Sequence, residues 1–315
     1  MLRLVILRLA FGAATVLAAS MLIFAGTEIL PGDLATAILQ NAATPENVAE
    51  LRAQLGLDRP PTVRYLEWIG HAVRGDLGVS LSNQHPVMED LAPRLRNTFF
   101  LAAFAALVAV PLAVMLGLLA AIYQNSLYDR AINFVTLLTI SIPEYLVGYL
   151  LVKYFSVRWG LFPSLANVTA DNTLLQRIDL TFLPMLTLVL VVVAHMMRMT
   201  RASVLNIMAS PYIEMAFLKG LSKSRVVVRH AFPNALAPII AVIALNLAYL
   251  VVGVVVVEVV FVYPGLGQLL VDAVSKHDLP VVQACGLIFA CVFILLNLAA
   301  DVMGILSNPR LRRGR

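Results

Sequence analysis

The sequence predicts an all-α membrane protein with six transmembrane helices. Of its 315 residues, 60% are hydrophobic and 13% are charged. Soluble domains hold about 25% charged residues, so this composition excludes an ordinary water-soluble fold. A helix needs roughly 20 apolar residues to cross the hydrocarbon layer with its backbone hydrogen bonds satisfied internally. Six segments reach this length, namely residues 9–30, 99–123, 132–155, 180–199, 235–262 and 281–303.

The first span is expected to remain an uncleaved helix. Its apolar run is longer than that of a signal peptide, and no clear small-residue cleavage site follows it. Lys and Arg are concentrated in the segments that lie inside if the N-terminus is cytoplasmic. Because basic loops resist translocation, both termini are predicted to be cytoplasmic.

The outer connection at about residues 31–97 is too long to be a plain loop. It contains a predicted helix at 45–55, capped by Thr44, and an amphipathic helix at 62–73. Four apolar and aromatic residues of the second helix are expected at the membrane surface. They are Tyr65, Leu66, Trp68 and Ile69.

This organisation divides the chain into two parts. Residues 1–97 form the first span and the outer loop, and residues 98–315 form a five-helix core with an inner loop at about 200–234. No internal repeat is visible, so any symmetry in the working protein has to come from a second subunit. Cys285 and Cys291 fall on different faces of one helix, which predicts neither a disulfide nor a metal site.

The inner loop predicts two short helices around a glycine. Ser210 is a suitable N-cap before Pro211, and Gly220 is a natural left-handed helix end, so a helix is expected over Pro211–Leu218. A second helix is expected to start after Ser222 and to end near Pro233. The loop mixes apolar and basic side chains, which favours a partner surface. The alternative is that its basic residues simply lie against lipid headgroups.

The spacing in this loop resembles the signature of binding-protein-dependent ABC importer permeases. In that signature E-A-A is followed by three residues, a glycine, nine residues and I-x-L-P. Glu214 and Ala216 match its start, Gly220 matches the glycine and Pro233 matches the final proline. The sequence departs from it at Met215, His230 and Phe232.

Further motifs occur in the order typical of the dipeptide and oligopeptide branch of that family, which the chain resembles over essentially its whole length. They are GDLGVS at 75–80 followed by Pro86-Val87, SIP at 141–143, MTRAS at 199–203, VEVVFVYPGLG at 257–267 and NPR at 308–310. The resemblance implies a type I ABC importer permease in the inner (plasma) membrane of a prokaryote, with the outer loop in the periplasm.

The resemblance also implies how such a chain is driven: its inner loop docks in a groove of a cytoplasmic ATPase. The residues implied in this ATPase coupling are Glu214, Met215, Ala216, Lys219, Gly220, Arg229, His230 and Pro233. The implied partners are a second homologous permease subunit, two cytoplasmic ATPase subunits and an extracytoplasmic substrate-binding protein, and nucleic acid is not among them. No stretch of the chain fits G-x-x-x-x-G-K-[ST]. We therefore expect no catalytic residue and no cofactor on this chain, with ATP and Mg held by the partner subunits.

Charged residues inside the spans are candidates for a translocation path, because burying them in lipid is costly. Glu144 lies near the middle of the third span, beside Ser141, Pro143 and Tyr145. One hypothesis is that Glu144 binds a substrate ammonium group; the other is that it is paired with the companion permease or protonated. Glu258, late in the fifth span, favours structural pairing or an outer gate over direct contact with the substrate.

The favoured function is therefore half of the channel of an ATP-driven importer for short peptides or a related small solute. The alternative is a secondary transporter without a dedicated ATPase, which usually carries an internal repeat. Dipeptide, oligopeptide, glutathione and nickel complexes are all possible substrates within the family resemblance. The sequence does not choose among them.

Overall fold

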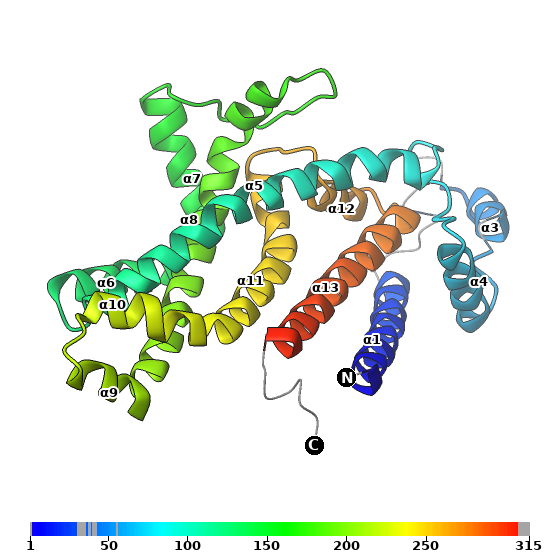
Figure 1. Cartoon of the computed structure of the whole chain (residues 1–315). Helices are drawn as coiled ribbons and strands as arrows, with labels where there is room; N and C mark the ends of the chain where they lie inside the picture. Colours follow the sequence, from blue (N-terminus) through cyan, green and yellow to red (C-terminus); the bar gives the residue numbers. More distant parts are fainter. Residues whose placement is uncertain (1, 30–35, 37–38, 40–42, 55, 308–315) are drawn as a thin grey trace.

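The structure is a computed structural model that describes residues 2–29, 36, 39, 43–54 and 56–307, and the NPR motif lies outside them. The regular elements of these residues are helices (Figure 1). The α-helices are α1 (Leu2–Ile29), α3 (Pro45–Gln54), α4 (Pro61–Val73), α5 (Val87–Ile122), α6 (Leu127–Ser141), α7 (Glu144–Leu151), α8 (Leu174–Met208), α9 (Pro211–Leu218), α10 (Lys223–Val226), α11 (Phe232–Val260), α12 (Leu266–Ser275) and α13 (Leu279–Ser307). Two π-helical segments, Val152–Arg158 and Val227–Ala231, follow α7 and α10.

Five of the expected spans are continuous helices, and the third is broken. α6 and α7 meet at an angle of 102°, so the prediction of one helix over residues 132–155 is wrong. The break lies at Ile142 and Pro143. Proline has no amide hydrogen to donate and disfavours a helical conformation in the residue before it. Ile142 accordingly is extended, with φ −90° and ψ 127°.

The helix predicted to end near Pro233 instead continues into the fifth span. Residues Lys223–Val260 form one apolar helix of spanning length. Pro233 lies in the first turn of α11, directly after the π-helical segment Val227–Ala231. A π turn changes the register of the backbone hydrogen bonds, and a proline in a first turn gives up no intrahelical bond. The proline is therefore accommodated without ending the helix.

The outer region packs on the first span. α3 begins after Thr44, whose hydroxyl accepts a hydrogen bond from the Asn47 amide at 3.3 Å, which confirms the predicted cap. In α4 the rings of Tyr65 and Trp68 lie 5.6 and 6.0 Å from the ring of Phe24 in α1. These two aromatic residues therefore pack against α1, a contact that the sequence did not predict, and their location at the membrane surface stays a prediction.

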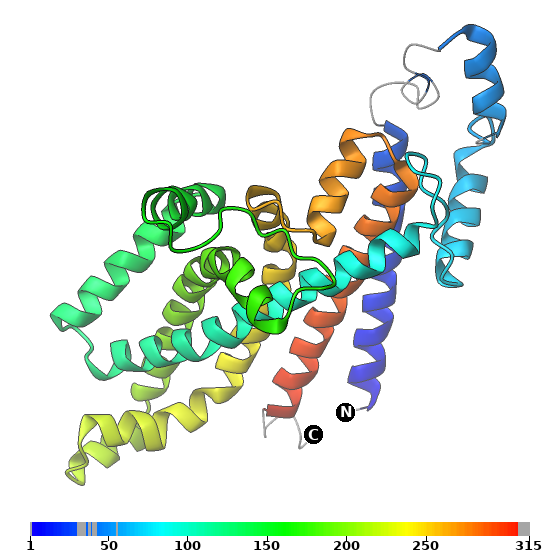
Figure 2. The same cartoon turned by 90° about the horizontal axis from the view of Figure 1, so that it is seen from above.

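The ends of the described chain lie on one side of the molecule, together with α9, whereas α3 and α12 lie on the other (Figure 2). α1 and α13 pack side by side, and an exposed ion pair between Arg8 and Asp301 joins them at 2.6 Å. The predicted division at residue 97 falls within the single helix α5. The backbone does not break there, and the division into two parts stays a prediction.

The most extensive helix contact joins α5 and α8, which cross in the middle of the molecule (Figure 1). The face of α5 at this contact carries small buried residues at four-residue spacing. They are Ala105, Ala109, Ala113, Gly117 and Ala121. Small residues let two helix backbones approach closely. At Gly117 the approach is closest, since an added Cβ would lie 2.8 Å from Thr200 Cβ and 2.9 Å from the Met197 carbonyl oxygen.

We predict that Gly117→Ala destabilises the protein. The added methyl group has no room at the crossing, and overpacking of this kind costs about 1–3 kcal/mol. Thermal unfolding in detergent should show a lower Tm than wild type. Gly26→Ala is the matched control, because a Cβ there meets no described atom within 4 Å. An unchanged Tm for Gly117→Ala would contradict the close crossing.

Candidate functional site

The inner loop forms an elbow, residues 209–222, that contains α9 and the turn after it. α9 has the predicted bounds, Pro211–Leu218. Ser210 lies at the expected N-cap position, but its side chain does not cap α9. Its hydroxyl donates instead to the Ile207 carbonyl at 2.6 Å, at the end of α8. The hydroxyl thus holds the corner between the two helices.

The turn after α9 is a Schellman motif. Gly220 has φ +78°, in the left-handed region that favours glycine. Its amide donates to the Phe217 carbonyl at 2.8 Å, and the Leu221 amide donates to the Ala216 carbonyl at 3.3 Å. These two bonds define the motif, which also brings the side chains of Ala216 and Leu221 together. The four-residue spacing from Ala216 to Gly220 is therefore a requirement of the turn.

A buried apolar cluster under the elbow, called the basal cluster here, fixes α9 to the rest of the chain. Its buried members are Ala121, Val204, Ile213, Val226, Val227, Ala231, Ala235 and Ile239. They come from α5, α8, α9, the α10 region and α11. Ile213 is the member on α9 and is fully buried. α9 is therefore packed against all of these helices.

The opposite face of α9 is exposed. Met215 and Leu218 are 55% and 75% exposed, and the charged residues Glu214 and Lys219 lie on the same surface. Large exposed apolar side chains beside charged ones are typical of a surface that contacts another protein. Of the predicted coupling residues, Ala216 faces inward and these four face outward.

The remaining predicted coupling residues lie beyond the elbow. Arg229 and Pro233 are exposed, and His230 is half-buried. The His230 carbonyl accepts a hydrogen bond from the Asn234 side chain at 2.7 Å. These three residues lie on the continuous helix that leads to α11, rather than on α9.

A second candidate region is a cavity of about 510 Å³ between α7, α8 and α11. Glu144, the first residue of α7, lies in its wall, together with His195 and Met199 from α8 and Asn246 and Tyr249 from α11. Most of the other lining residues are aliphatic. They are Leu188, Val191, Val192, Val242, Leu245, Leu250 and Gly253.

The bend in the third span places Glu144 at this cavity. A Cβ added to Gly253 would lie 3.6 Å from the Glu144 carboxylate, so the glycine leaves space beside it. Ser141, Pro143 and Tyr145 do not line the cavity. The Ser141 hydroxyl donates to the Leu137 carbonyl within α6, and Tyr145 is exposed. Of this predicted group, only Glu144 faces the cavity.

Glu258 lies elsewhere and is fully buried. Its carboxylate accepts hydrogen bonds from the Thr98 hydroxyl at 2.6 Å and from the Gly267 and Gln268 amides at 2.7 and 3.1 Å. It thereby satisfies the first free amides of α12. A Cβ on Gly265 would overlap this carboxylate, which explains the glycine. Glu258 fits the structural pairing expected from the sequence and does not line the cavity.

Sequence reasoning missed the partners of this anchor. Thr98 also accepts from the Leu266 amide at 2.8 Å, and Asn97 donates to the Pro264 carbonyl at 2.9 Å. Both lie in α5, far from α12 in the sequence. The VEVVFVYPGLG motif indicated that the segment around Glu258 is important. Nothing in the sequence of that segment indicates that it pairs with Asn97 and Thr98 of α5.

Two further acids were also missed. Asp278, before α13, accepts hydrogen bonds from the Ser80 hydroxyl and from the Leu81 amide, which ties the GDLGVS segment to the α12–α13 turn. Asp129, in α6, pairs with Arg201 of the MTRAS motif through two contacts of 2.7 Å. Both acids are nearly fully buried. For the Asp129–Arg201 pair, the only indication in the sequence was the MTRAS motif, which contains Arg201.

Comparison with known proteins identifies the class to which this arrangement belongs. Residues 113–313 match the family described as binding-protein-dependent transport system inner membrane component, and residues 1–102 match the N-terminal part described for such membrane components. The chain is 38% identical over 312 residues to the glutathione transport system permease protein GsiC of Escherichia coli strain K12. It is 37% identical over 312 residues to the protein of the same name from Salmonella typhi. Both alignments cover 99% of each chain.

These matches favour the importer permease over the secondary transporter considered from the sequence, because the family and the relatives named above are permeases or membrane components of binding-protein-dependent transport systems. They also confirm the resemblance to the peptide-transport branch and the location in the inner membrane of a bacterium. The chain belongs to the family of binding-protein-dependent transport system inner membrane components and is a permease of an ABC importer of that kind.

Proposed function

We propose that the permease forms half of a channel that is opened and closed by separate ATPase subunits docked on α9. The observation that carries this proposal is the two-sided character of α9. One face is held in the basal cluster through Ile213, and the other exposes Met215 and Leu218 beside charged residues. The complete assembly would contain a second homologous permease, two ATPases that hold ATP and Mg, and an extracytoplasmic binding protein.

The connection from α9 to the cavity supports this role. α9 is joined to the end of α8, and the basal cluster holds it against the start of α11. The same two helices form most of the cavity wall, with His195 on α8 and Asn246 on α11. Because packed helices move as rigid elements, tilting of α9 changes the width of the cavity.

The proposed topology places α9 and both chain ends in the cytoplasm. Docking on a cytoplasmic ATPase requires this for α9, and the described chain ends lie on the same side of the molecule as α9 (Figure 2). The distribution of Lys and Arg in the sequence favours the same orientation. α3, α4 and α12 then face the periplasm, where a binding protein delivers its ligand.

We infer that the solute is glutathione or a short peptide with a free amino group. A volume of about 510 Å³ lies in the range of small-molecule sites. Glu144 supplies a carboxylate in a mainly aliphatic wall, which suits an ammonium group. The relatives named above are glutathione permeases, and glutathione carries such a group.

Gly220→Val is predicted to uncouple import from the ATPase. A β-branched residue in the left-handed conformation costs about 1–2 kcal/mol, so the turn after α9 should change its path. Uptake of glutathione into proteoliposomes that contain the complete complex should fall to near background, with normal insertion of the variant. Co-purification of the ATPase subunits should be weakened in parallel.

Gly160→Val is the matched control for this variant. Gly160 has φ +63° and, like Gly220, no described atom within 4 Å of an added Cβ, but it lies far from the elbow. It should import at the wild-type rate. A Gly220→Val variant that inserts normally, retains the ATPase and imports like wild type would show that the elbow is not the coupling element.

Glu144→Gln is predicted to reduce import of a solute with a free amino group. A charge-assisted hydrogen bond is worth about 1.5–3 kcal/mol, so the initial uptake rate should fall roughly 10- to 100-fold. ATP hydrolysis should persist, because α9 is unchanged. Glu89→Gln removes an exposed carboxylate outside the cavity and serves as the control. If uptake by Glu144→Gln equals that of wild type for solutes with and without the amino group, Glu144 does not bind it.

A further inference from the structure

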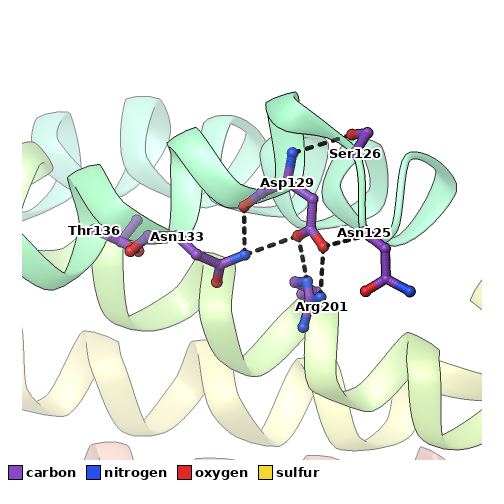
Figure 3. A network of polar contacts seen from close by, with 6 residues as sticks. All are labelled: Asn125, Ser126, Asp129, Asn133, Thr136 and Arg201. Atoms are coloured by element: carbon purple, nitrogen blue, oxygen red, sulfur yellow. Dashed lines mark hydrogen bonds and ion pairs between the residues drawn. The ribbon is translucent and has the colours of Figure 1, made fainter.

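Asp129 and Arg201 form a polar clamp between α6 and α8 (Figure 3). Arg201 donates from Nε to Oδ1 and from Nη2 to Oδ2, both at 2.7 Å. The Asn133 side chain donates to Oδ1 at 2.8 Å, and the Asn125 amide donates to Oδ2 at 2.9 Å. The carboxylate therefore accepts four hydrogen bonds, which uses its full acceptor capacity.

The surrounding turn is arranged to hold this carboxylate. Asn125 has φ +67°, in the left-handed region, and in this conformation its backbone amide donates a hydrogen bond to the Asp129 carboxylate. The Ser126 hydroxyl accepts from the Asp129 amide at 3.2 Å and caps α6. Asp129 is only 3% exposed. The Asp129 carboxylate is buried and fully hydrogen-bonded, and Arg201 binds it through two contacts, so the pair differs from fully exposed ion pairs, most of which contribute little.

The position of the clamp connects the two candidate regions. Arg201 lies about two turns before the end of α8, which leads directly into α9. Asp129 lies in the first turn of α6, and α6 leads to the break where Glu144 enters the cavity. Among the described residues it is the one ion pair that joins α6 to α8.

We propose that this clamp transmits movement of the α9 elbow to the broken span α6–α7 and so to Glu144. Aliphatic contacts between helices permit small sliding movements, whereas a forked arginine–carboxylate pair fixes both separation and orientation. When α8 moves with α9, the clamp makes α6 move with it. Asp129 and Arg201 are thus positioning residues. The inference rests on the proposed function, because the movement begins at the ATPase.

The test measures movement at Glu144 without depending on the identity of the solute. Glu144→Cys is introduced with both native cysteines replaced by alanine, and the complete complex is reconstituted in proteoliposomes. The rate of labelling by a water-soluble maleimide is compared in the nucleotide-free and ATP–vanadate-trapped states. With the clamp intact, trapping should change the labelling rate.

Asp129→Asn in this background should reduce the effect of trapping by a factor of about 2 to 30, the usual range for breaking a coupling contact. ATP hydrolysis should remain, because the exposed face of α9 is untouched. Arg201→Lys keeps the charge but loses the fork, and it should give an intermediate loss with normal assembly. Asp301→Asn, which breaks the Arg8–Asp301 pair at the other end of the molecule, should leave the response unchanged.

The possible outcomes distinguish failure of the clamp proposal from failure of the proposed function. If the Glu144→Cys protein with an intact clamp responds to trapping and the Asp129→Asn and Arg201→Lys variants of it respond equally, the clamp does not transmit movement. If these variants lose assembly, ATP hydrolysis and the labelling response in proportion, the pair only stabilises the fold and the proposal is overturned. If the Glu144→Cys protein with an intact clamp does not respond, the proposed function fails and the transmission role falls with it.

Discussion

Burial of Ile213 among residues of α5, α8 and α11 is the contact on which the working parts of this permease depend. A short helix outside the bilayer cannot be stable alone, since isolated helices of this length are marginal in water. Here one apolar face is anchored and the chain reverses at Gly220, so the other face stays exposed in a fixed orientation. The elbow is thereby a rigid extension of the transmembrane helices.

The buried carboxylates divide into two groups by how their hydrogen bonds are satisfied. Asp129, Glu258 and Asp278 each accept several hydrogen bonds, at least one of them from a donor distant in sequence, and each ties a turn to a helix. Glu144 faces a cavity instead. Because a buried charge is tolerated only when it is paired or hydrated, the first group indicates structure, whereas Glu144 borders the cavity that we propose for the solute. The clamp at Asp129 links the elbow to that place.

Hydropathy predicted the positions of the spans, and local signals predicted α9 to the residue, because Pro211 and Gly220 act through their own backbones. The sequence did not show which of the prolines within the spans would break a helix. Pro143 breaks a span, while Pro184 and Pro238 lie inside continuous helices. A proline removes the same backbone donor at each of these positions, so its presence alone does not tell which helix breaks. The partners of Glu258 and Arg201 were equally invisible, since pairs so distant in sequence leave no periodic pattern.

Separate ATPase subunits are proposed to drive this permease through the elbow. The most direct measurement is uptake of glutathione by proteoliposomes that contain the permease pair and loaded binding protein, with and without the ATPase subunits, under identical ion gradients. We expect accumulation against the solute gradient only when the ATPases and ATP are both present. Accumulation by the permease pair alone, driven by an ion gradient, would contradict it.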